Sequence, residues 1–266
     1  IIASKGEKVV GTELDKSGFP LLVKLINARE DLSIQVHPNN VYALQVEGEM
    51  GKTEVWYILE ADKDASLVVG TNNCTSDLLK ESLECGDITK YINTIPIKKG
   101  EVYFVESGLV HGIGSGVVVA EIQQNSDATY RLHDYDRGRE IHIDKALDVV
   151  DLSLEGSRSL GLSVNYGGYK KTYFCLCKEF ALEEYEIYSE LVEESDPERF
   201  YIFTCVAGNG KIVSTTIKEE FRMGESILIP ATLGEYRIIG EGLKIIKSYV
   251  PDVKKVEKEI LEIVKK

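Results

Sequence analysis

The feature that most constrains the fold of this chain is the regular occurrence of turn-forming residues. Gly, Asn or Asp interrupts the sequence every few residues and leaves short strand-like runs between them. Clear examples lie at residues 21–25, 54–59, 101–105 and 116–122. Short runs bounded by turn-forming residues are typical of strands, and many of them in succession indicate a sandwich or a barrel. The sequence therefore predicts a mainly β fold.

Helical patterns are few. Residues 75–85 favour a short helix, and a Lys/Glu-rich tail at residues 251–266 favours a second one. The apolar side chains of the tail recur at helical spacing, namely Val253, Val256, Ile260 and Ile263. We expect this C-terminal helical tail to pack across a sheet.

A second set of strand-like runs occupies residues 169–250. The segment 99–105, in which Gly-Glu precedes an apolar strand, has an echo at 223–230. The echo favours a degenerate internal repeat. We therefore expect two tandem barrels, one in a domain at residues 1–150 and the other at residues 151–266.

The charge of the chain limits its partners. Forty-four acidic and thirty-one basic residues give a net charge of -13, which repels nucleic acid and anionic membrane surfaces. The sequence has no apolar run near the roughly 20 residues that a membrane span needs, and no signal-peptide pattern at its amino end. We expect a cytoplasmic protein without nucleic-acid or membrane partners. A small anionic substrate would need a locally positive pocket.

Two of the four histidines stand where a metal site is easiest to build. Strand residues two apart project to the same face, so Ser33, Gln35 and His37 would point the same way. The alternation likewise places Lys52, Glu54 and Trp56 on one face. A cation and a carboxylate would thus face inward together.

The fourth donor is His111, at the mouth of a turn that leads into an apolar strand. Together with Gln35, His37 and Glu54 it would supply N and O donors that suit zinc (Zn²⁺) with a position left open for water or substrate. This arrangement indicates a catalytic metal. The alternative is that both histidines are ordinary barrel residues.

Five segments with distinctive composition occur in one order along the chain. They are 19–26 (Phe-Pro-Leu-Leu-Val-Lys-Leu-Ile), 35–39 (Gln-Val-His-Pro-Asn), 51–57 (Gly-Lys-Thr-Glu-Val-Trp-Tyr), 110–114 (Val-His-Gly-Ile-Gly) and 121–137, which begins Glu-Ile-Gln-Gln-Asn-Ser-Asp. They resemble the signatures of type I mannose-6-phosphate isomerases (phosphomannose isomerases) of the short bacterial form, which belong to the cupin superfamily. The resemblance spans about residues 19–150, and the second half matches only in general character.

The resemblance implies a fold and a reaction. It implies that the two barrels are cupin jelly rolls, and that the enzyme interconverts mannose 6-phosphate and fructose 6-phosphate through an enediol. It also implies four zinc ligands and one main catalytic arginine, Arg131; the ligands are Gln35, His37, Glu54 and His111. Because no histidine follows His142, we expect one zinc ion per chain.

This reaction needs a group that stabilises an enediolate and a group that moves a proton. Zinc answers the first need, and Arg131 and Lys52 would add positive charge near the developing oxyanion or the phosphate. Ser33 and Arg137 are the candidates for binding the phosphate itself, with Arg139 as the substitute for Arg137.

The proton could be handled by either of two carboxylates. We favour Asp127 for this role and expect Glu121 to hold a ligand histidine in its tautomer. Trp56 is a candidate for a sugar-stacking wall, although an inward Trp in a barrel is also typical of the core.

Two other functions fit a barrel of this kind. An iron-dependent cupin oxygenase is one, but the inward Gln35 favours a non-redox metal. A non-enzymatic sugar-binding cupin is the other, and the set of Lys52, Asp127 and Arg131 argues against it. The expected partner is a small sugar phosphate, and the expected assembly is a monomer or a homodimer.

Overall fold

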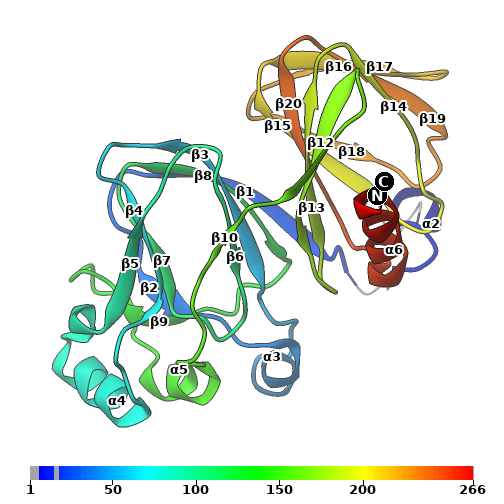
Figure 1. The fold of residues 1–266 in the computed structure, drawn as a ribbon. Coiled ribbons are helices and arrows are strands. Elements are labelled where there is room, and N and C mark those ends of the chain that lie inside the picture. The colour runs from blue at the N-terminus through cyan, green and yellow to red at the C-terminus, as the bar shows by residue number, and fades with distance from the viewer. Residues whose placement is uncertain (1–5, 15–17, 266) are drawn as a thin grey trace. The chain divides into compact units, whose positions relative to one another are not determined.

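The computed structural model describes residues 6–14 and 18–265, and strands predominate in it (Figure 1). The chain divides into two compact units. The first unit is Leu22–Ser159, and the second combines Leu160–Lys266 with Ile1–Leu21. The division between the units thus falls after Ser159, whereas the sequence predicted it between residues 150 and 151.

The N-terminal segment joins the second unit because its backbone hydrogen-bonds there. It contains the short helix α2 (Glu7–Val10). The amide of Thr12 donates to the carbonyl oxygen of Pro197 at 3.2 Å, and the amide of Ala231 donates to the carbonyl oxygen of Val9 at 3.0 Å. The sequence could not predict that this segment joins the second unit, because the hydrogen bonds that hold it there come from residues far away in the chain.

The first unit consists of two five-stranded sheets. The first sheet has the order β1 (Leu21–Ala28), β8 (Val117–Gln124), β3 (Glu54–Ala61), β6 (Val102–Val105) and β10 (Arg158–Ser159). The second has the order β5 (Ile92–Pro96), β4 (Ser66–Thr71), β7 (His111–Ile113), β2 (Ile34–Val36) and β9 (Tyr130–His133). The helical elements are α3 (Asn40–Val46), α4 (Ser76–Cys85), the 3₁₀ turn η1 (Ile88–Lys90) and α5 (Ile143–Val149).

Apolar side chains fill both faces of the second sheet. Between the sheets, Leu67 and Val69 of β4 belong to a buried cluster with Ile58 and Val119. On the outer face, helix α5 packs over β2 and β9 and helix α4 packs beside α5, and their apolar side chains form a separate cluster (Figure 1). Helix α4 begins where the sequence predicts, because the side chain of Thr75 accepts a hydrogen bond from the amide of Leu78.

The second unit also consists of two sheets. The six-stranded sheet has the order β11 (Leu162–Asn165), β12 (Tyr169–Leu176), β13 (Ala181–Ile187), β20 (Leu243–Tyr249), β15 (Tyr201–Ala207) and β18 (Ser226–Ile229). The four-stranded sheet has the order β14 (Glu190–Glu194), β19 (Glu235–Ile239), β16 (Asn209–Ser214) and β17 (Lys218–Arg222). Helix α6 (Val253–Val264) packs through Val256 and Ile260 against Ala181 and Tyr249.

The two units share one strand order. Eight strands of the first unit lie in the orders 1-8-3-6 and 2-7-4-5, and β13 to β20 lie in the orders 13-20-15-18 and 14-19-16-17. Consecutive strands alternate between facing sheets in much the same way in both. This double-sheet arrangement is that of the jelly roll. The sheets remain open at their edges, so each unit is a sandwich where the sequence predicted a barrel.

The echo noticed in the sequence lies at equivalent places in the two units. Gly100 and Gly224 precede β6 and β18, and they have φ angles of 84° and 89°. The next residue in each turn, Glu101 or Glu225, accepts a hydrogen bond from the amide three residues before it, at 2.8 and 3.0 Å. The same backbone turn therefore starts the same strand twice.

All five cysteines are free, and only Cys205 is buried. In the part of the chain that the structure describes, no helix has the length and apolar character to cross a membrane.

Candidate metal centre and cavity

The candidate metal centre lies where β2, β3 and β7 approach each other in the first unit. Gln35 of β2 pairs directly with His111 of β7, so their side chains share one face. His37 follows β2 at the next position on that face, and Glu54 is the first residue of β3. The alternation of strand side chains thus brings all four predicted ligands to one place.

The donor atoms of these four residues converge. The two imidazole Nε2 atoms of His37 and His111 lie 3.1 Å apart. Glu54 Oε1 lies 3.2 Å from His37 Nε2, and the side-chain amide nitrogen of Gln35 lies 3.3 Å from His111 Nε2. Among the described residues, His37, Glu54 and His111 form a group that could hold a metal ion, and all three are buried.

The surroundings of the two imidazoles fix which nitrogen faces the centre. His37 Nδ1 donates to the carbonyl oxygen of Ala128 at 3.0 Å, and His111 Nδ1 donates to that of Leu109 at 2.8 Å. Both Nε2 atoms are then lone-pair acceptors that point toward each other, and neither can donate to the other. Glu54 Oε1 is buried and accepts no hydrogen bond. A cation among these atoms would satisfy all of them, so the residues fit a metal ion.

The charge states of the ligands agree with this fit. Burial, assisted by the charge of Lys52, lowers the pKa of His37 to about 3, and burial also lowers the pKa of His111. Burial opposes ionisation of Glu54, but His37 and Lys52 outweigh it and hold the pKa of this carboxyl below its usual range. Neutral imidazoles and a carboxylate are the forms that bind a metal.

Two buried groups hold Glu54 in position. Lys52 Nζ lies 3.2 Å from Glu54 Oε1 and 3.3 Å from the hydroxyl of Thr129. The indole Nε1 of Trp56 donates to Glu54 Oε2 at 3.1 Å and to Glu121 Oε2 at 3.0 Å. Trp56 therefore links the two carboxylates, in addition to packing in the core.

Lys24 on β1 belongs to the same network, although sequence reasoning did not select it. Its ammonium donates to Glu121 Oε1 at 3.0 Å and to the side-chain oxygen of Gln123. Burial and the charge of Glu54 raise the pKa of Glu121, against the opposing effect of Lys24. The signal was present in the sequence, because Lys24 is a lone charge inside an apolar strand run.

A cavity of about 340 Å³ opens beside these ligands. Its lining residues come from both sheets and from the loops that flank their strands, including the loops before and after β9. Those with polar side chains are Lys24, Ser33, Gln35, Lys52, Trp56, Glu121, Asp127, Thr129, Arg131 and Arg139. The cavity thus combines four cationic side chains with two carboxylates, so a locally positive pocket exists in this acidic protein.

The arginines after β9 are arranged around one buried carboxylate, Asp134. Arg139 donates to both oxygens of Asp134, and its side chain lines the cavity. Arg137 instead donates through Nε to the backbone oxygen of Asp134, lies over the ring of Tyr135 and is absent from the lining. Of the two arginines considered for the phosphate, the structure places Arg139 in the cavity.

Arg131 has an unusual environment. Its Nη1 donates to the carbonyl oxygen of Glu140 at 2.8 Å, whereas its buried Nε has no hydrogen-bond partner. Asp127 lies on the same cavity wall, with an exposed side chain and an amide that donates to Glu49 at 3.2 Å. Ser33 is buried beside Gln35, and its hydroxyl donates to the amide oxygen of Gln35 at 3.4 Å.

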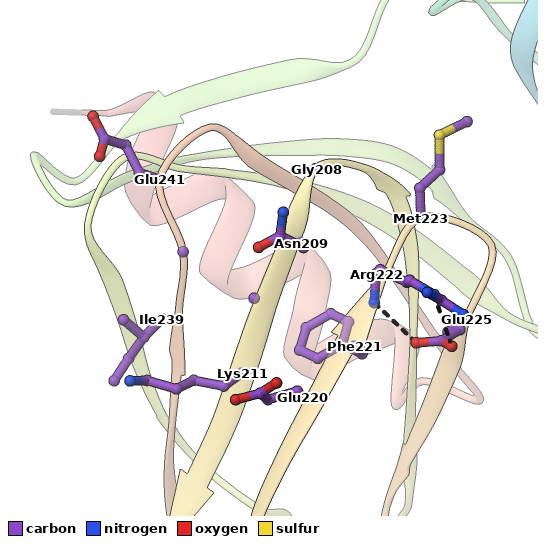
Figure 2. A pocket seen from close by; sticks show the side chains of 12 residues that line it. Gly208, Asn209, Lys211, Glu220, Phe221, Arg222, Met223, Glu225, Ile239 and Glu241 are labelled. Atoms are coloured by element: carbon purple, nitrogen blue, oxygen red, sulfur yellow. Dashed lines mark hydrogen bonds and ion pairs between the residues drawn. The ribbon is translucent and has the colours of Figure 1, made fainter.

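A wider groove of about 880 Å³ lies in the second unit (Figure 2). Its walls come from β16, β17 and the turns beside them, and its lining contains no histidine. Arg222 pairs with Glu225 at 3.4 Å, as the dashed lines show (Figure 2). The charged groups around this groove do not converge on one point as the ligands of the first unit do.

Fold and site together define a class: a cupin-type protein whose first sandwich buries a metal-ligand cluster beside a cationic cavity. Comparison with known proteins specifies the class further. Residues 1–69 match the model of the phosphomannose isomerase type I catalytic domain, and residues 170–250 match that of the mannose-6-phosphate isomerase cupin domain. The chain belongs to the type I mannose-6-phosphate isomerase family and is an aldose–ketose isomerase.

Individual relatives support this membership. The chain is 35% identical to a mannose-6-phosphate isomerase of Bacillus subtilis over 86% of its own length and 74% of the relative. It is 33% identical to that of Streptococcus mutans over 88% and 75%. The crystal structure of the Bacillus subtilis mannose 6-phosphate isomerase superposes with a TM-score of 0.85 and 31% identity, covering 93% of this chain and 80% of the other.

Proposed function

We propose that this chain interconverts mannose 6-phosphate and fructose 6-phosphate with one zinc ion held by Gln35, His37, Glu54 and His111. The observation that carries the proposal is the pair of imidazole Nε2 atoms 3.1 Å apart, both fixed as acceptors, next to Gln35, which lines the cavity. Two imidazole nitrogens, a carboxylate and the Gln35 side chain, turned so that its amide oxygen instead of its nitrogen faces the ion, suit zinc with a position left for substrate oxygens.

When bound, the zinc ion would polarise the carbonyl group and stabilise the negative charge of the enediolate. The remaining requirements fall to the side chains of the cavity. Lys52 is buried and held 3.2 Å from Glu54 Oε1, so it can stabilise an oxyanion without reorganisation. Arg131 Nε has no hydrogen-bond partner and lies 3.9 Å from Asp134 Oδ1, and we assign Arg131 the main role in stabilising the developing charge.

Proton transfer between C1 and C2 needs a carboxylate within reach of both carbons. Both oxygens of Glu121 accept hydrogen bonds, from Lys24 and from Trp56, which suits a group that organises the site. Asp127 lines the same cavity, and none of the described residues donates a hydrogen bond to its carboxylate. We therefore assign proton transfer to Asp127 and the positioning role to Glu121.

The phosphate would bind at the end of the sugar that lies away from the reacting carbons C1 and C2. Arg139 and Ser33 line the cavity, and the planar guanidinium suits a phosphate oxygen pair. Asp134 holds Arg139 in place before substrate arrives. We assign the phosphate to Arg139 and Ser33, and replace Arg137 of the sequence prediction by Arg139.

We also propose that the two sandwiches are tandem cupin domains, of which only the first is catalytic. Their common strand order supports this. The cytoplasmic location and the state of assembly, monomer or homodimer, stay predictions.

One experiment tests the proposed function. Mannose 6-phosphate turnover is measured by a coupled assay of fructose 6-phosphate, alongside elemental analysis of the purified protein. We expect about one zinc per chain, loss of turnover with a chelator and its return with Zn²⁺. Iron as the bound metal, two tight metals per chain, or full turnover by metal-free protein would contradict the proposal.

A further inference from the structure

The second sandwich buries a cluster of charged side chains that the proposed reaction does not use. Its centre is Lys247 on β20, which is 6% exposed. Fully buried lysines are rare unless they are paired, because removing an ammonium from water is costly. The role of this charge follows from comparing the strand position of Lys247 with the equivalent position in the first unit.

The repeated turn gives a register that relates the two units. The residue four positions after the turn glutamate lies opposite Glu54 in the first unit and opposite Tyr201 in the second. Glu54 is a candidate metal ligand. Tyr201 therefore occupies, in the second sandwich, the strand position that a metal ligand occupies in the first.

The neighbouring strand continues the same register. Two residues further along, Trp56 lies opposite Glu121 on β8, and Phe203 lies opposite Lys247 on β20. Lys247 thus holds the place of Glu121, the carboxylate next to the metal ligands. A positive side chain stands in the second unit where a negative one stands in the first.

Inward-facing polar groups surround the Lys247 ammonium. Its Nζ lies 2.8 Å from Glu193 Oε2 and 3.7 Å from the centre of the Tyr201 ring. The hydroxyl of Tyr236 donates to the same carboxylate oxygen at 2.8 Å. Glu193 lies directly opposite Tyr236 on the β14–β19 ladder, as Gln35 lies opposite His111 on the β2–β7 ladder.

The cluster is neutral and internally satisfied. A second pair, Lys171 and Glu183, lies beside it at 2.9 Å. Burial opposes the charge of Lys247, but Glu193 and Glu183 outweigh it, so the pKa of Lys247 is raised. Burial likewise opposes the charge of Glu193, but Lys247 outweighs it and the pKa of Glu193 is lowered. Both groups are charged at neutral pH.

We propose that the Lys247 ammonium is the built-in cation of the second sandwich and stands in the place that a metal ion would take in the first. A carboxylate, a tyrosine hydroxyl and an aromatic face hold it, as nitrogen and oxygen donors would hold a metal. The second unit therefore needs no metal to satisfy its centre, and its stability does not depend on metal supply.

The first test removes the charge and keeps the shape. Lys247→Met leaves Glu193 without its cation, and breaking one partner of a buried pair is strongly destabilising. We expect the melting temperature of the second unit to fall by about 10 °C or more. The matched control is Lys244→Met on the same strand, whose side chain is 32% exposed, and its effect should be within about 1–2 °C. Equal stability of the two variants would overturn the proposal.

The second test asks whether Glu193 is the partner that matters. Adding Glu193→Gln to Lys247→Met removes the uncompensated carboxylate, so the double variant should regain at least half of the lost melting temperature. Glu193→Gln is also measured alone. If the melting-temperature losses of the two single variants add up to that of the double variant, this carboxylate does not hold the cation and the proposal fails.

A third measurement covers variants that fold poorly. Lys247→Ala removes three methylene groups and the ammonium, so n-propylammonium is the matching probe. We expect it to restore folding at millimolar to molar concentration, and tetramethylammonium, which has the charge but no N–H donor, to have no effect. No difference between the two cations would count against an ammonium site.

The last arm uses wild-type holoprotein and a chelator, with hydrogen exchange as the readout. We expect protection to fall in β2 and β7 and to stay unchanged in β13 and β20. Loss of protection in β13 and β20 would show that the second unit needs a metal. None of these measurements uses isomerase activity, so the inference can stand or fall separately from the proposed function.

Discussion

The two sandwiches have the same strand order and differ in how their buried polar atoms are satisfied. In the second unit, Tyr236 and Lys247 donate to one oxygen of Glu193, and the Tyr185 hydroxyl lies 2.8 Å from the other and 2.8 Å from Glu183. In the first unit, Glu54 Oε1 accepts no hydrogen bond and faces two imidazole nitrogens that are acceptors themselves. The second centre holds its own ammonium. In the first, the Gln35 amide nitrogen lies 3.3 and 3.5 Å from the two imidazole nitrogens and Lys52 Nζ lies 3.2 Å from Glu54 Oε1, and a cation among these acceptors would satisfy them further.

This contrast shows how a functional site can be distinguished from a structural cluster. Buried polar groups are nearly always paired, so a set of buried acceptors that face one another marks the place of a ligand. The number of charged residues does not make the distinction, because both sandwiches bury several. What differs is whether the acceptors converge on a cation of the protein or on one another.

Removing a ligand of the first unit should have the largest effect. His37→Ala should abolish zinc binding and lower turnover by at least about 10³-fold, since the loss of one of four ligands exposes the metal to exchange. Elemental analysis and the coupled assay measure the two losses. The melting of the second unit should not change, and full activity at unchanged zinc content would remove His37 from the ligand set.

A substitution of Arg131 should lower turnover without changing zinc binding in the first unit. Arg131→Ala should lower kcat by about 10²–10³-fold, because it removes one preorganised stabiliser of developing charge, while zinc content stays near wild type. Arg131→Lys should restore little, since lysine lacks the planar fork. A raised KM with unchanged kcat would instead make Arg131 a uniform binding group and pass the catalytic role to Lys52 or Asp127.

Arg139 and Arg137 form a matched pair on one loop. Arg139→Gln should raise KM for mannose 6-phosphate by about tenfold to a hundredfold with little change in kcat, because it removes a charge-assisted hydrogen bond to phosphate. Arg137→Gln should leave KM within about twofold, since Arg137 is not part of the cavity lining. Steady-state kinetics decide between the two, and the reverse result would restore Arg137 as the phosphate ligand.

The smallest effect should be equal in the two units. Gly100→Ala and Gly224→Ala each place a side chain at a φ angle near +85°, which costs about 1–2 kcal/mol in unfolding free energy. The single Trp, Trp56, is buried in the first unit, so its fluorescence reports the unfolding of that unit. Gly100→Ala should shift this signal and Gly224→Ala should not. Unequal costs, measured by calorimetry for both, would show that the turns are not equivalent.

Much of the fold follows from local pattern. The strand-like runs, the helix that begins after Thr75 and the repeated Gly-Glu turn depend on residues close in sequence, so the sequence could predict them. The site followed partly from the same logic, because alternation on a strand places Gln35 and His37 on one face. Lys24 was missed because its partners, Glu121 and Gln123, lie on a strand almost a hundred residues away.

The sequence by itself determined which residue types are available: an amide, a carboxylate and two histidines in strand-like segments of the first 111 residues, and no histidine after His142. The tertiary structure decided how they meet. It returned the N-terminal segment to the second unit, brought Arg139 rather than Arg137 to the cavity, and placed Lys247 beside Glu193, which is 54 residues away. The physical reason is that strand order and register set which distant side chains face each other, and neither can be read from local spacing.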